Sequence, residues 1–359
     1  MKLVVIIPAL NEEKTIAQVV RGVPRDIPGI DDVEVIVLND GSTDSTAEEA
    51  QRAGATVIGL PGGGGLGTVF RTGFEAAMRR GADIIVNIDG DGQFNPADIA
   101  RLIAPLLEDR ADFVTCSRFA DPALRPEMPA VKYWGNRAVT WIINWICGSR
   151  FTDVSCGFRA FNREAAYRLT LFGRFTYTQE TFIDLFAKGV RIVEVPLKVR
   201  GVREHGRSRV ARSVFRYASS SLPIILRAMR DIQPLKFFGG IAVFFGLIGL
   251  LLGSFVTGWY LWQKRTTPFT SLIPISGVFI TLGVLLAVLA LLADMLGRQR
   301  RIIEELLYHA RKRAYAQDSR PLLLVERMNA AGAPGSAESW TGASAGQSAA
   351  RGVRGVAGG

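Results

Sequence analysis

The sequence predicts an α/β fold, with a Rossmann-like, mostly parallel sheet in its first half and two transmembrane helices in its second half. Short apolar runs alternate with helical patterns of about 10 to 15 residues, which is typical of a parallel sheet covered by helices on both faces. Further along, residues 237–262 and 266–293 contain no charged side chain. Each stretch exceeds the roughly 20 apolar residues needed to cross a bilayer. A basic, amphipathic stretch joins the two parts.

Four apolar runs are the predicted strands of the sheet. They cover residues 3–7, 33–38, 56–60 and 84–88. Runs of Val, Ile and Leu without alternation indicate strands that are buried on both faces. Each run ends in polar, Gly-rich sequence, and the carboxyl ends of parallel strands meet at the edge where α/β proteins bind ligands. Asp40, Asp89 and Asp91 are therefore expected to converge at this edge.

Asp89 and Asp91 directly follow the fourth run and form the most informative motif. Residues i and i+2 of an extended or turning backbone point the same way, so both carboxylates can bind one hard divalent cation, with the Gln93 carbonyl as a third oxygen. Mg²⁺ or Mn²⁺ held by so few protein ligands takes its other ligands from nucleotide phosphates. The alternative interpretation is a solvated Asp-Gly turn.

Three ordered segments give the chain a resemblance to a known family. They are PALNEE at 8–13, NDGSTD at 39–44 and DGDGQ at 89–93. In this order they resemble the inverting family 2 glycosyltransferases of the GT-A fold. Three later segments, CSR at 116–118, DVSCGFR at 153–159 and HGRSR at 205–209, are similar to the polyprenyl-phosphate glycosyltransferases, the dolichyl-phosphate mannose synthase group. The resemblance covers about residues 1–210.

This resemblance implies transfer of a single hexose from a UDP- or GDP-linked sugar to an undecaprenyl or dolichyl phosphate. The predicted nucleotide-binding residues are Pro8, Ala9, Glu12, Asp40, Gly67 and Asp89. The predicted acceptor-binding residues are Ser117, Arg118, Arg137, Arg203, Ser208 and Arg209, of which Arg118 and the Arg209 segment match the family's motifs. The predicted catalytic residues are Asp91, Arg118, Arg137 and Arg209. A turn or helix cap is the alternative for Asp40, although Asp44 suits that role better, and a surface position is the alternative for each arginine.

The predicted acceptor needs little chemical activation. A phosphate monoester has a second pKa of about 6 and is mostly ionised at neutral pH. Arginine side chains suit its oxygens by bidentate geometry and position it as a nucleophile. Three roles stay open for Glu180: binding a sugar hydroxyl, standing where related enzymes keep a base, or being an incidental acid on a core-facing helix. Asp153 and Ser155 are expected to order the acceptor loop.

Residues 62–67 match the G-x-G-x-x-G pattern of dinucleotide-binding proteins. That fingerprint belongs after the first strand of a βαβ unit, whereas this one follows the third run, so a nicotinamide or flavin enzyme is disfavoured. The segment Gly65-Leu66-Gly67-Thr68 instead resembles a loop of the family that passes close to the nucleotide-sugar. The extra glycines depart from the family's more usual Asn or Lys, which bears on the flexibility of this loop.

Prolines and basic residues refine the membrane prediction. Pro268 and Pro274 place the start of the second spanning helix near Ile275, and two buried core helices are the alternative. The short connection between the spans contains only two basic residues, Lys264 and Arg265. Basic residues that follow the second span include Arg298, Arg300, Arg301, Arg311, Lys312 and Arg313. The positive-inside rule therefore predicts a multi-pass protein of the inner (plasma) membrane, with its catalytic domain and tail in the cytoplasm. The start of the chain predicts no signal peptide, because only a short apolar run separates Lys2 from the polar segment that begins at Asn11.

The basic stretch accounts for most of the chain's positive charge. Residues 198–236 hold ten basic residues against Glu204 and Asp231, a net charge of +8 out of the chain's +10. Residues 208–233 are predicted to form amphipathic helices in the headgroup plane of an anionic membrane. The alternative is a solvated helical face. Nucleic-acid binding is disfavoured because the basic run leads directly into a membrane span.

Four segments are thus predicted. They are a GT-A domain at 1–207, the interface helices at 208–233, two transmembrane helices at 234–297, and a cytoplasmic basic segment with a Gly-, Ala- and Ser-rich tail at 298–359. A processive polysaccharide synthase is the alternative enzyme, disfavoured because the chain has no Gln-x-x-Arg-Trp segment and few spans. A non-catalytic membrane scaffold, or a helper in lipid-sugar translocation, is the alternative from another class. Homo-oligomer formation stays open.

Overall fold

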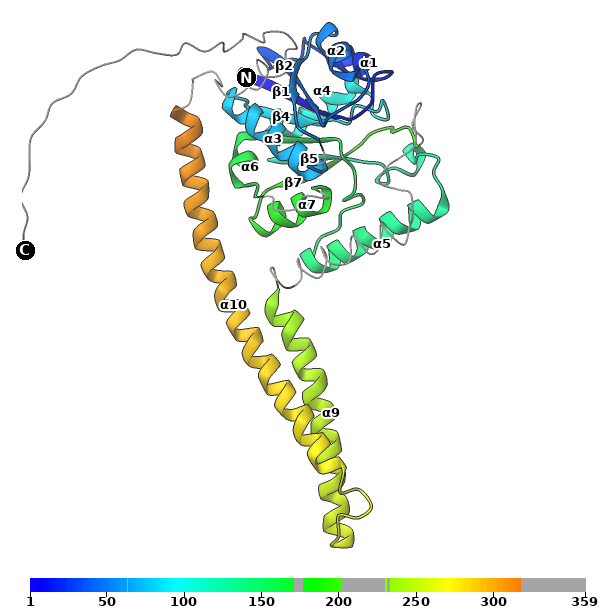
Figure 1. The fold of residues 1–359 in the computed structure, drawn as a ribbon, viewed down its shortest axis with the longest axis vertical. Coiled ribbons are helices and arrows are strands. Elements are labelled where there is room, and N and C mark those ends of the chain that lie inside the picture. Colours follow the sequence, from blue (N-terminus) through cyan, green and yellow to red (C-terminus); the bar gives the residue numbers. More distant parts are fainter. Residues whose placement is uncertain (63, 171–176, 202–229, 231–232, 318–359) are drawn as a thin grey trace, which may run out of the picture. The chain divides into compact units, whose positions relative to one another are not determined.

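The computed structural model describes residues 1–62, 64–170, 177–201, 230 and 233–317. Within them, a domain built on a seven-stranded sheet is followed by two long helices, α9 (Pro234–Gln263) and α10 (Leu272–Gln317) (Figure 1). Most of the predicted interface segment 208–233 and the tail after residue 317 lie outside the described residues. Three predicted acceptor residues, Arg203, Ser208 and Arg209, lie outside them as well.

The elements of the sheet domain alternate along the chain as the apolar runs predict. The strands are β1 (Lys2–Ala9), β2 (Asp32–Asn39), β3 (Thr56–Gly59), β4 (Ile84–Asn87), β5 (Phe113–Ser117), β6 (Arg159–Asn162) and β7 (Ile192–Pro196). The helices are α1 (Ile16–Gly22), α2 (Thr46–Arg52), α3 (Leu66–Arg79), α4 (Ile99–Leu107), α5 (Ala130–Cys147), α6 (Arg163–Arg168) and α7 (Thr178–Ala187), with short 3-10 turns η1 (Pro96–Asp98) and η2 (Pro122–Leu124). The four predicted strands are confirmed to within two residues at each end.

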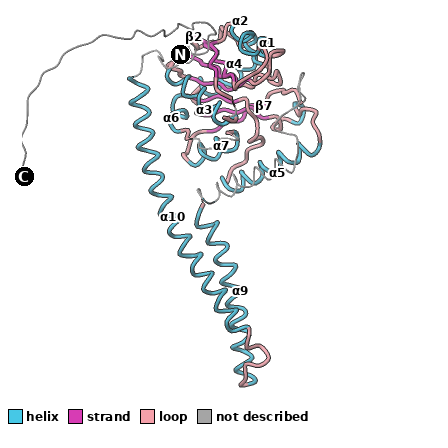
Figure 2. The backbone as a smooth tube through the Cα atoms, viewed as in Figure 1, coloured by secondary structure: helices cyan, strands magenta, loops and turns pink. Residues whose placement is uncertain are grey.

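The strand order is β3-β2-β1-β4-β6-β5-β7, and every neighbouring pair is parallel except the two that include β6. The prediction of a mostly parallel sheet is confirmed. Residues 3–7 of the central strand β1 are fully buried, which explains why this run contains only Val, Ile and Leu. Helix α3 approaches β2 closely at Gly73, where a Cβ would lie 2.8 Å from Leu38 Cδ2. Figure 2 shows that the strands all belong to this domain, whereas α9 and α10 are helical along their length.

Strand β6 runs antiparallel between β4 and β5, and this reversal shapes the edge of the sheet at which β4 and β5 end. Its first residue, Arg159, pairs with Asn87 at the end of β4 and with Thr115 near the end of β5. The loop before β6 therefore lies at the same edge as the residues that follow β4 and β5. Periodicity in a strand of four residues carries no signal for strand direction, so the sequence does not predict this reversal.

Helices α9 and α10 are both long and apolar enough to cross a membrane. They lie side by side (Figure 1), with the rings of Phe245 and Phe279 stacked at 5.8 Å. Gly249 permits a close approach, because a Cβ there would lie 2.7 Å from Ile280 Cγ1. Only 17% of the most apolar 18-residue window of each helix is buried. This exposure argues against the alternative of two core helices, since core helices are mostly buried.

Helix α10 begins earlier than predicted and extends beyond the predicted span. It begins at Leu272 rather than near Ile275, because Pro274 lies in the first turn, where the missing N–H of proline is tolerated. It also continues without interruption past the apolar stretch to Gln317.

Candidate functional site

The loops after β1 and β2 are joined by hydrogen bonds at the carboxyl edge of the sheet. Asn11, which has a φ of 53°, accepts at Oδ1 a hydrogen bond from Thr43 N (2.8 Å) and donates its own N–H to Ser42 Oγ (3.0 Å). These bonds order the chain around four of the predicted nucleotide-binding residues, namely Pro8, Ala9, Glu12 and Asp40.

Two aspartates of the second loop have different environments. Asp40 N donates to Ala9 O (3.0 Å), and Asp40 Oδ1 is buried without a hydrogen-bond partner among the described residues. Burial raises the pKa of the Asp40 carboxyl. Asp44 Oδ1 instead accepts the Thr46 N–H (3.1 Å) at the start of α2. Asp40 thus keeps an acceptor atom for a ligand, and Asp44 has the structural role expected of it.

The glycine-rich loop after β3 lies against Asp40. Gly41 has a φ of +74°, and a Cβ on it would lie 2.9 Å from Gly62 Cα. A Cβ on Gly62 would in turn lie 3.3 Å from Asp40 O. Glycine is needed for both the positive φ and the close approach. The loop leads into the first turn of α3, which contains the buried Gly67.

Asp89 and Asp91 follow β4, on the other side of the end of β1. The turn between them packs against β1, because a Cβ on Gly90 would lie 3.2 Å from Pro8 O. Asp91 is only 3% exposed. The structure therefore brings Asp40 and this acidic pair to the two sides of one strand end, as the parallel sheet predicts.

Gln93, the third predicted metal ligand, is bonded to the chain after β7. Its N–H donates to Asp91 Oδ1, its carbonyl accepts the Arg200 N–H, and its Nε2 donates to Arg200 O, all at 3.0 Å. Among the described residues, no three or more His, Cys, Asp or Glu side chains form a metal-ion site. The carboxylates of Asp89 and Asp91 are hard oxygen donors of the kind that Mg²⁺ or Mn²⁺ binds together with substrate phosphates, so their role as metal ligands stays a prediction. The assignment of Gln93 as a ligand stays a prediction as well.

Buried side chains support the position of Asp89. Asn87 Nδ2, at the end of β4, donates to Gly157 O (2.8 Å) and to Tyr177 Oη (2.9 Å). Gly157 is pressed against Asp89, because a Cβ there would lie 2.9 Å from Asp89 Oδ2. The buried Tyr177 ring stacks on Phe70 of α3 with a centroid distance of 4.2 Å. Asp89 therefore rests on a packed, hydrogen-bonded layer rather than on a mobile turn.

Arg159 is a fully buried cation in the same layer. Its Nε donates to Cys156 O (2.7 Å) and its Nη2 to Val154 O (3.0 Å), while its Nη1 is buried without a partner among the described residues. Burial lowers the pKa of Arg159 to about 10, so the side chain is still charged at neutral pH. Burial also raises the pKa of Tyr177, and the charge of Asp89 adds to that effect.

Several buried polar atoms around this edge have no hydrogen-bond partner within the described parts of the chain. They are Asp40 Oδ1, Asn87 Oδ1, Ser155 Oγ and Arg159 Nη1. Only three other atoms of this kind occur in those parts. Because nearly all buried polar groups in folded proteins are hydrogen-bonded, this concentration distinguishes the edge from the rest of the described chain.

Comparison with known proteins identifies the family. Residues 4–170 match the family described as glycosyl transferase family 2. The chain is also 30% identical over 308 residues to glycosyltransferase AglJ of Haloferax volcanii, which covers 84% of this chain and 97% of that relative. The chain belongs to glycosyltransferase family 2.

Two further similar proteins have names that state their ligands. The chain is 32% identical over 213 residues to a UDP-N-acetylglucosamine–dolichyl-phosphate N-acetylglucosaminyltransferase of Methanococcus voltae, covering 54% of this chain and 83% of the relative. Among solved structures, it is similar to glucosyl-3-phosphoglycerate synthase of Mycobacterium tuberculosis in complex with UDP. That similarity has a TM-score of 0.50 and 25% identity, and it covers 62% of this chain and 80% of the other. The predicted family and GT-A-like fold are confirmed.

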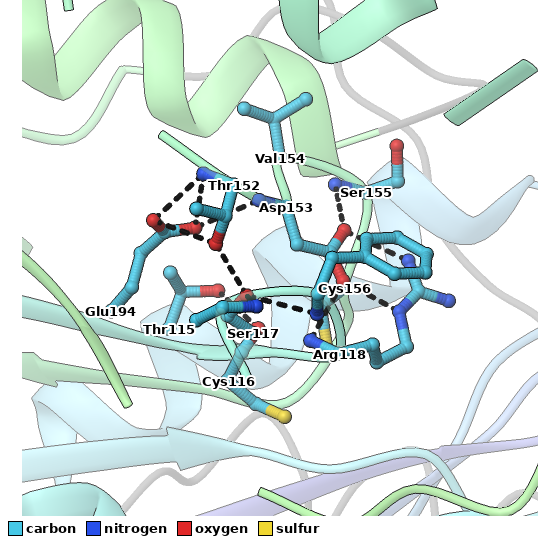
Figure 3. A network of polar contacts seen from close by, with 12 residues as sticks. Thr115, Cys116, Ser117, Arg118, Thr152, Asp153, Val154, Ser155, Cys156 and Glu194 are labelled. Carbon is cyan, nitrogen blue, oxygen red and sulfur yellow. Dashed lines mark hydrogen bonds and ion pairs between the residues drawn. The ribbon is translucent and has the colours of Figure 1, made fainter. Parts of the chain in front are cut away.

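The transferase has a second, cationic part of the edge, where β5 ends at Ser117 and is followed by Arg118 (Figure 3). Arg118 Nε and Nη2 donate to the two carboxylate oxygens of the fully buried Asp153, at 2.6 and 2.9 Å. Burial acts to lower the pKa of Arg118, but the Asp153 carboxylate outweighs it and raises the pKa. Arg118 is thus a permanent cation, with Nη1 left out of this ion pair.

Glu194 of β7 orders this part of the transferase, and sequence reasoning missed it. Its carboxylate accepts the N–H groups of Thr152 and Asp153 and the Thr152 hydroxyl, at 2.8 to 3.0 Å. Burial raises the pKa of Glu194. Ser117 Oγ joins the same network at 2.6 Å from Thr152 Oγ1 (Figure 3). An acid inside the apolar run IVEVP is the sequence signal that points to Glu194.

The other predicted residues of the transferase lie on helices near these edges. Arg137 is exposed on α5, one turn after Tyr133, whose ring packs edge-on against Phe119 at 5.5 Å. The start of α5 therefore lies beside the residue that follows Arg118. Glu180 is half-buried in the first turn of α7, three residues after Tyr177. Its three alternative roles stay open.

We expect Gly157→Ala to reduce sugar transfer by about 10- to 10²-fold, because the added methyl group displaces the Asp89 carboxylate, and a small misplacement near the reacting groups has effects of this size. The measurement is kcat/KM for release of nucleoside diphosphate by the purified transferase. Gly59→Ala is the control, since a Cβ there meets nothing within 4 Å. Unchanged activity of Gly157→Ala, or the same loss in both variants, would contradict this role of the Gly157–Asp89 contact.

Proposed function

We propose that this transferase moves a single hexose, with inversion, from a UDP- or GDP-linked sugar to a polyprenyl phosphate at the cytoplasmic face of the inner (plasma) membrane. The observation that carries the proposal is the juxtaposition of two unlike parts of one edge. The acidic pair Asp89 and Asp91 follows β4, and the cation Arg118 follows β5, with only β6 between the two strands. A metal-bound diphosphate suits the first part, and an anionic acceptor suits the second.

The donor half of the proposal rests on the loops around β1. Asp89 and Asp91 would hold the Mg²⁺ or Mn²⁺, which when bound stabilises the departing diphosphate. Asp40 Oδ1, which has no hydrogen-bond partner in the described part of the chain, is suited to accept a hydrogen bond from the base or ribose. The UDP in the solved neighbour supports a nucleotide in this fold.

The acceptor half rests on Arg118. A phosphate monoester is mostly ionised at neutral pH, so it needs a positioned cation rather than a base. The Asp153 ion pair holds Arg118 in one orientation and so lowers the entropic cost of positioning. The dolichyl phosphate in the name of the Methanococcus relative supports a lipid phosphate as the acceptor.

Exposed tryptophans on α5 support attachment to a membrane, in addition to α9 and α10. Trp134, Trp141 and Trp145 are 67%, 68% and 60% exposed. At 100° per residue they fall on one face of the helix together with Val131, which is 54% exposed. Tryptophan is enriched at membrane–water interfaces, where its ring contacts the apolar region and its N–H stays hydrated. Arg137 flanks this face, so a helix that lay with these tryptophans in the interface would bring Arg137 to the phosphate headgroups.

The test of the proposal uses the purified full-length protein, Mg²⁺, vesicles containing undecaprenyl phosphate, and a panel of UDP- and GDP-sugars. The expected result is release of nucleoside diphosphate and a lipid product that carries one sugar. A polymeric product would favour the processive synthase, and preferential transfer to 3-phosphoglycerate would overturn the lipid acceptor. Failure to release nucleotide with every donor would overturn the activity.

The topology can be tested separately. With Cys147, the half-buried native cysteine, replaced by serine, a Thr266→Cys variant should react with an impermeant thiol reagent from outside the cell, and a Ser319→Cys variant should not. The reason is that basic residues gather before the first span and after the second, which lie on the same side of the membrane, whereas the connection between the spans has only two. The reverse labelling pattern would put the catalytic domain on the side that lacks nucleotide-sugars.

A further inference from the structure

Helix α10 is much longer than a membrane span. Its 46 residues measure about 69 Å at 1.5 Å per residue, whereas the hydrocarbon core of a bilayer is about 30 Å thick. The first charged residue of the helix is Asp294. Residues 294–317, here called the α10 extension, make up slightly more than half of the helix and are not needed to cross a membrane.

The α10 extension contacts the catalytic domain through Tyr308. This side chain is 8% exposed, although most of its neighbours on the extension are exposed. Its hydroxyl donates to Glu164 Oε2 of α6 (3.0 Å), and the Arg168 guanidinium lies over its ring at 4.6 Å. Tyr308 therefore packs on α6 rather than lying free in solvent.

Arg311 binds the carboxyl end of the same helix. Its Nη1 donates to Leu169 O (2.6 Å) and to Tyr167 O (3.2 Å). The last carbonyls of a helix lack partners within the helix and carry its negative dipole end, so they favour a cation. Lys188, at the end of α7, donates to the neighbouring Arg168 O (2.7 Å). Arg311 and Lys188, from different elements, thus bind the backbone carbonyls at the carboxyl end of α6.

The carboxyl end of α6, which the α10 extension contacts, is connected to the active site. Thr170, which follows α6, donates its N–H to Asp184 Oδ2 of α7 (2.8 Å). Helix α7 starts next to Tyr177, which is bonded to Asn87 beside the acidic pair. Tyr315 and Arg311 of the extension also line a pocket with Phe70 and Phe74 of α3, the helix that follows the glycine-rich loop.

The catalytic domain is held at a second point, near the start of α9. Gln233 immediately precedes α9, and its Nε2 donates to Ile146 O near the end of α5 (2.7 Å). A rigid body tethered at one point can swivel, whereas two separate attachments restrict both its height and its orientation. The two attachment points here lie on different helices of the domain, α5 and α6.

We infer that the α10 extension is a strut that holds the active site at a fixed height and orientation over the membrane, so that a phosphate confined to the headgroup layer reaches it. The inference rests on the proposed lipid acceptor. It assigns Tyr308 and Arg311 as positioning residues that act through α6 and touch neither substrate. Their effect should therefore depend on whether the acceptor is confined to a bilayer.

The test compares two acceptors in one full-length protein. The undocked variant is Tyr308→Ala with Arg311→Gln, and the matched control is Arg301→Gln with Arg313→Gln, which changes exposed residues of the same extension. With undecaprenyl phosphate in vesicles, kcat/KM of the undocked variant should fall about 10-fold or more. With a short, water-soluble isoprenyl phosphate in detergent, it should stay within about 2-fold of the wild-type value. Equal losses on both acceptors, or no loss in vesicles, would overturn the strut.

A second measurement does not depend on activity, so it separates failure of the strut from failure of the proposed function. A dye on an Arg52→Cys variant, at an exposed site of α2, transfers energy to a labelled lipid in vesicles. The time-resolved distance distribution should be narrow for the wild-type and control proteins and broad for the undocked variant. An unchanged distribution would overturn the strut whatever the acceptor proves to be.

Discussion

Asp91→Asn should reduce sugar transfer by about 10³-fold or more while leaving the fold and membrane insertion intact. The asparagine keeps an oxygen that accepts the Gln93 N–H, so the turn after β4 is preserved and only the charge is removed. Loss of that charge would weaken binding of the proposed metal ion, which would stabilise the departing diphosphate. Removing one charge-stabilising group alone typically costs about 10²- to 10³-fold, and the weaker metal binding adds to that loss. Asp91→Ala should be as inactive. The measurement is nucleoside diphosphate release under saturating donor and metal.

Asp98→Asn is the matched control for this prediction. Asp98 lies seven residues further on and pairs with Arg101 at the surface, so the Asp98→Asn variant should retain activity. Thermal unfolding of both variants should match that of the wild-type protein. Full activity of Asp91→Asn in the presence of a chelator would rule out the assigned metal site.

Arg118→Lys should reduce transfer by about 10²-fold, because lysine keeps the positive charge beside Asp153 but lacks the planar fork that binds a phosphate. Arg118→Ala is a poor test alone, since it leaves the buried Asp153 unpaired at a cost of about 3–5 kcal/mol. The double variant Arg118→Ala with Asp153→Asn avoids this and should be at least as inactive as Arg118→Lys. Arg101→Ala, a change at an exposed arginine, should have no effect.

The same activity assay, applied to a Glu180 variant and over a range of pH, tests whether the reaction needs a general base. Glu180→Gln should be milder than Arg118→Lys, and the wild-type rate should rise with pH only through the phosphate's own pKa of about 6. Suppose instead that Glu180→Gln is as inactive as Asp91→Asn while nucleotide binding is retained. A carboxylate would then take part in the chemistry, the acceptor would be a hydroxyl, and the polyprenyl-phosphate proposal would fail.

The strands at the start of the chain show how far sequence patterns reach. The run at 84–88 predicted a buried strand and the acidic pair after it, and the structure confirms β4 at Ile84–Asn87. The pattern was readable because a doubly buried strand needs apolar residues without interruption. The one polar residue in the strand, Asn87, was passed over, although an amide in a fully buried run is itself a signal of a hydrogen-bonded site.

The continuation of α10 shows the opposite case. Composition predicted a span and then a basic segment, since hydropathy marks the point where the apolar residues end. It carried no information on whether the helix ends there too. Helical backbone continues across that point to Gln317, and contacts of Tyr308 and Arg311 with α6 accompany it.

The sequence by itself determined the parallel sheet, the acidic edge, the family and the two apolar helices, because each is encoded in periodicity, composition or a contiguous motif. Only the tertiary structure decided what surrounds Asp89. Asn87 bonds to Gly157 and Tyr177, which are 70 and 90 residues away along the chain. The reversal of β6 brings Gly157 and the buried Arg159 to the edge. Pairing between such distant segments depends on the packing of the whole sheet, and no local pattern records it.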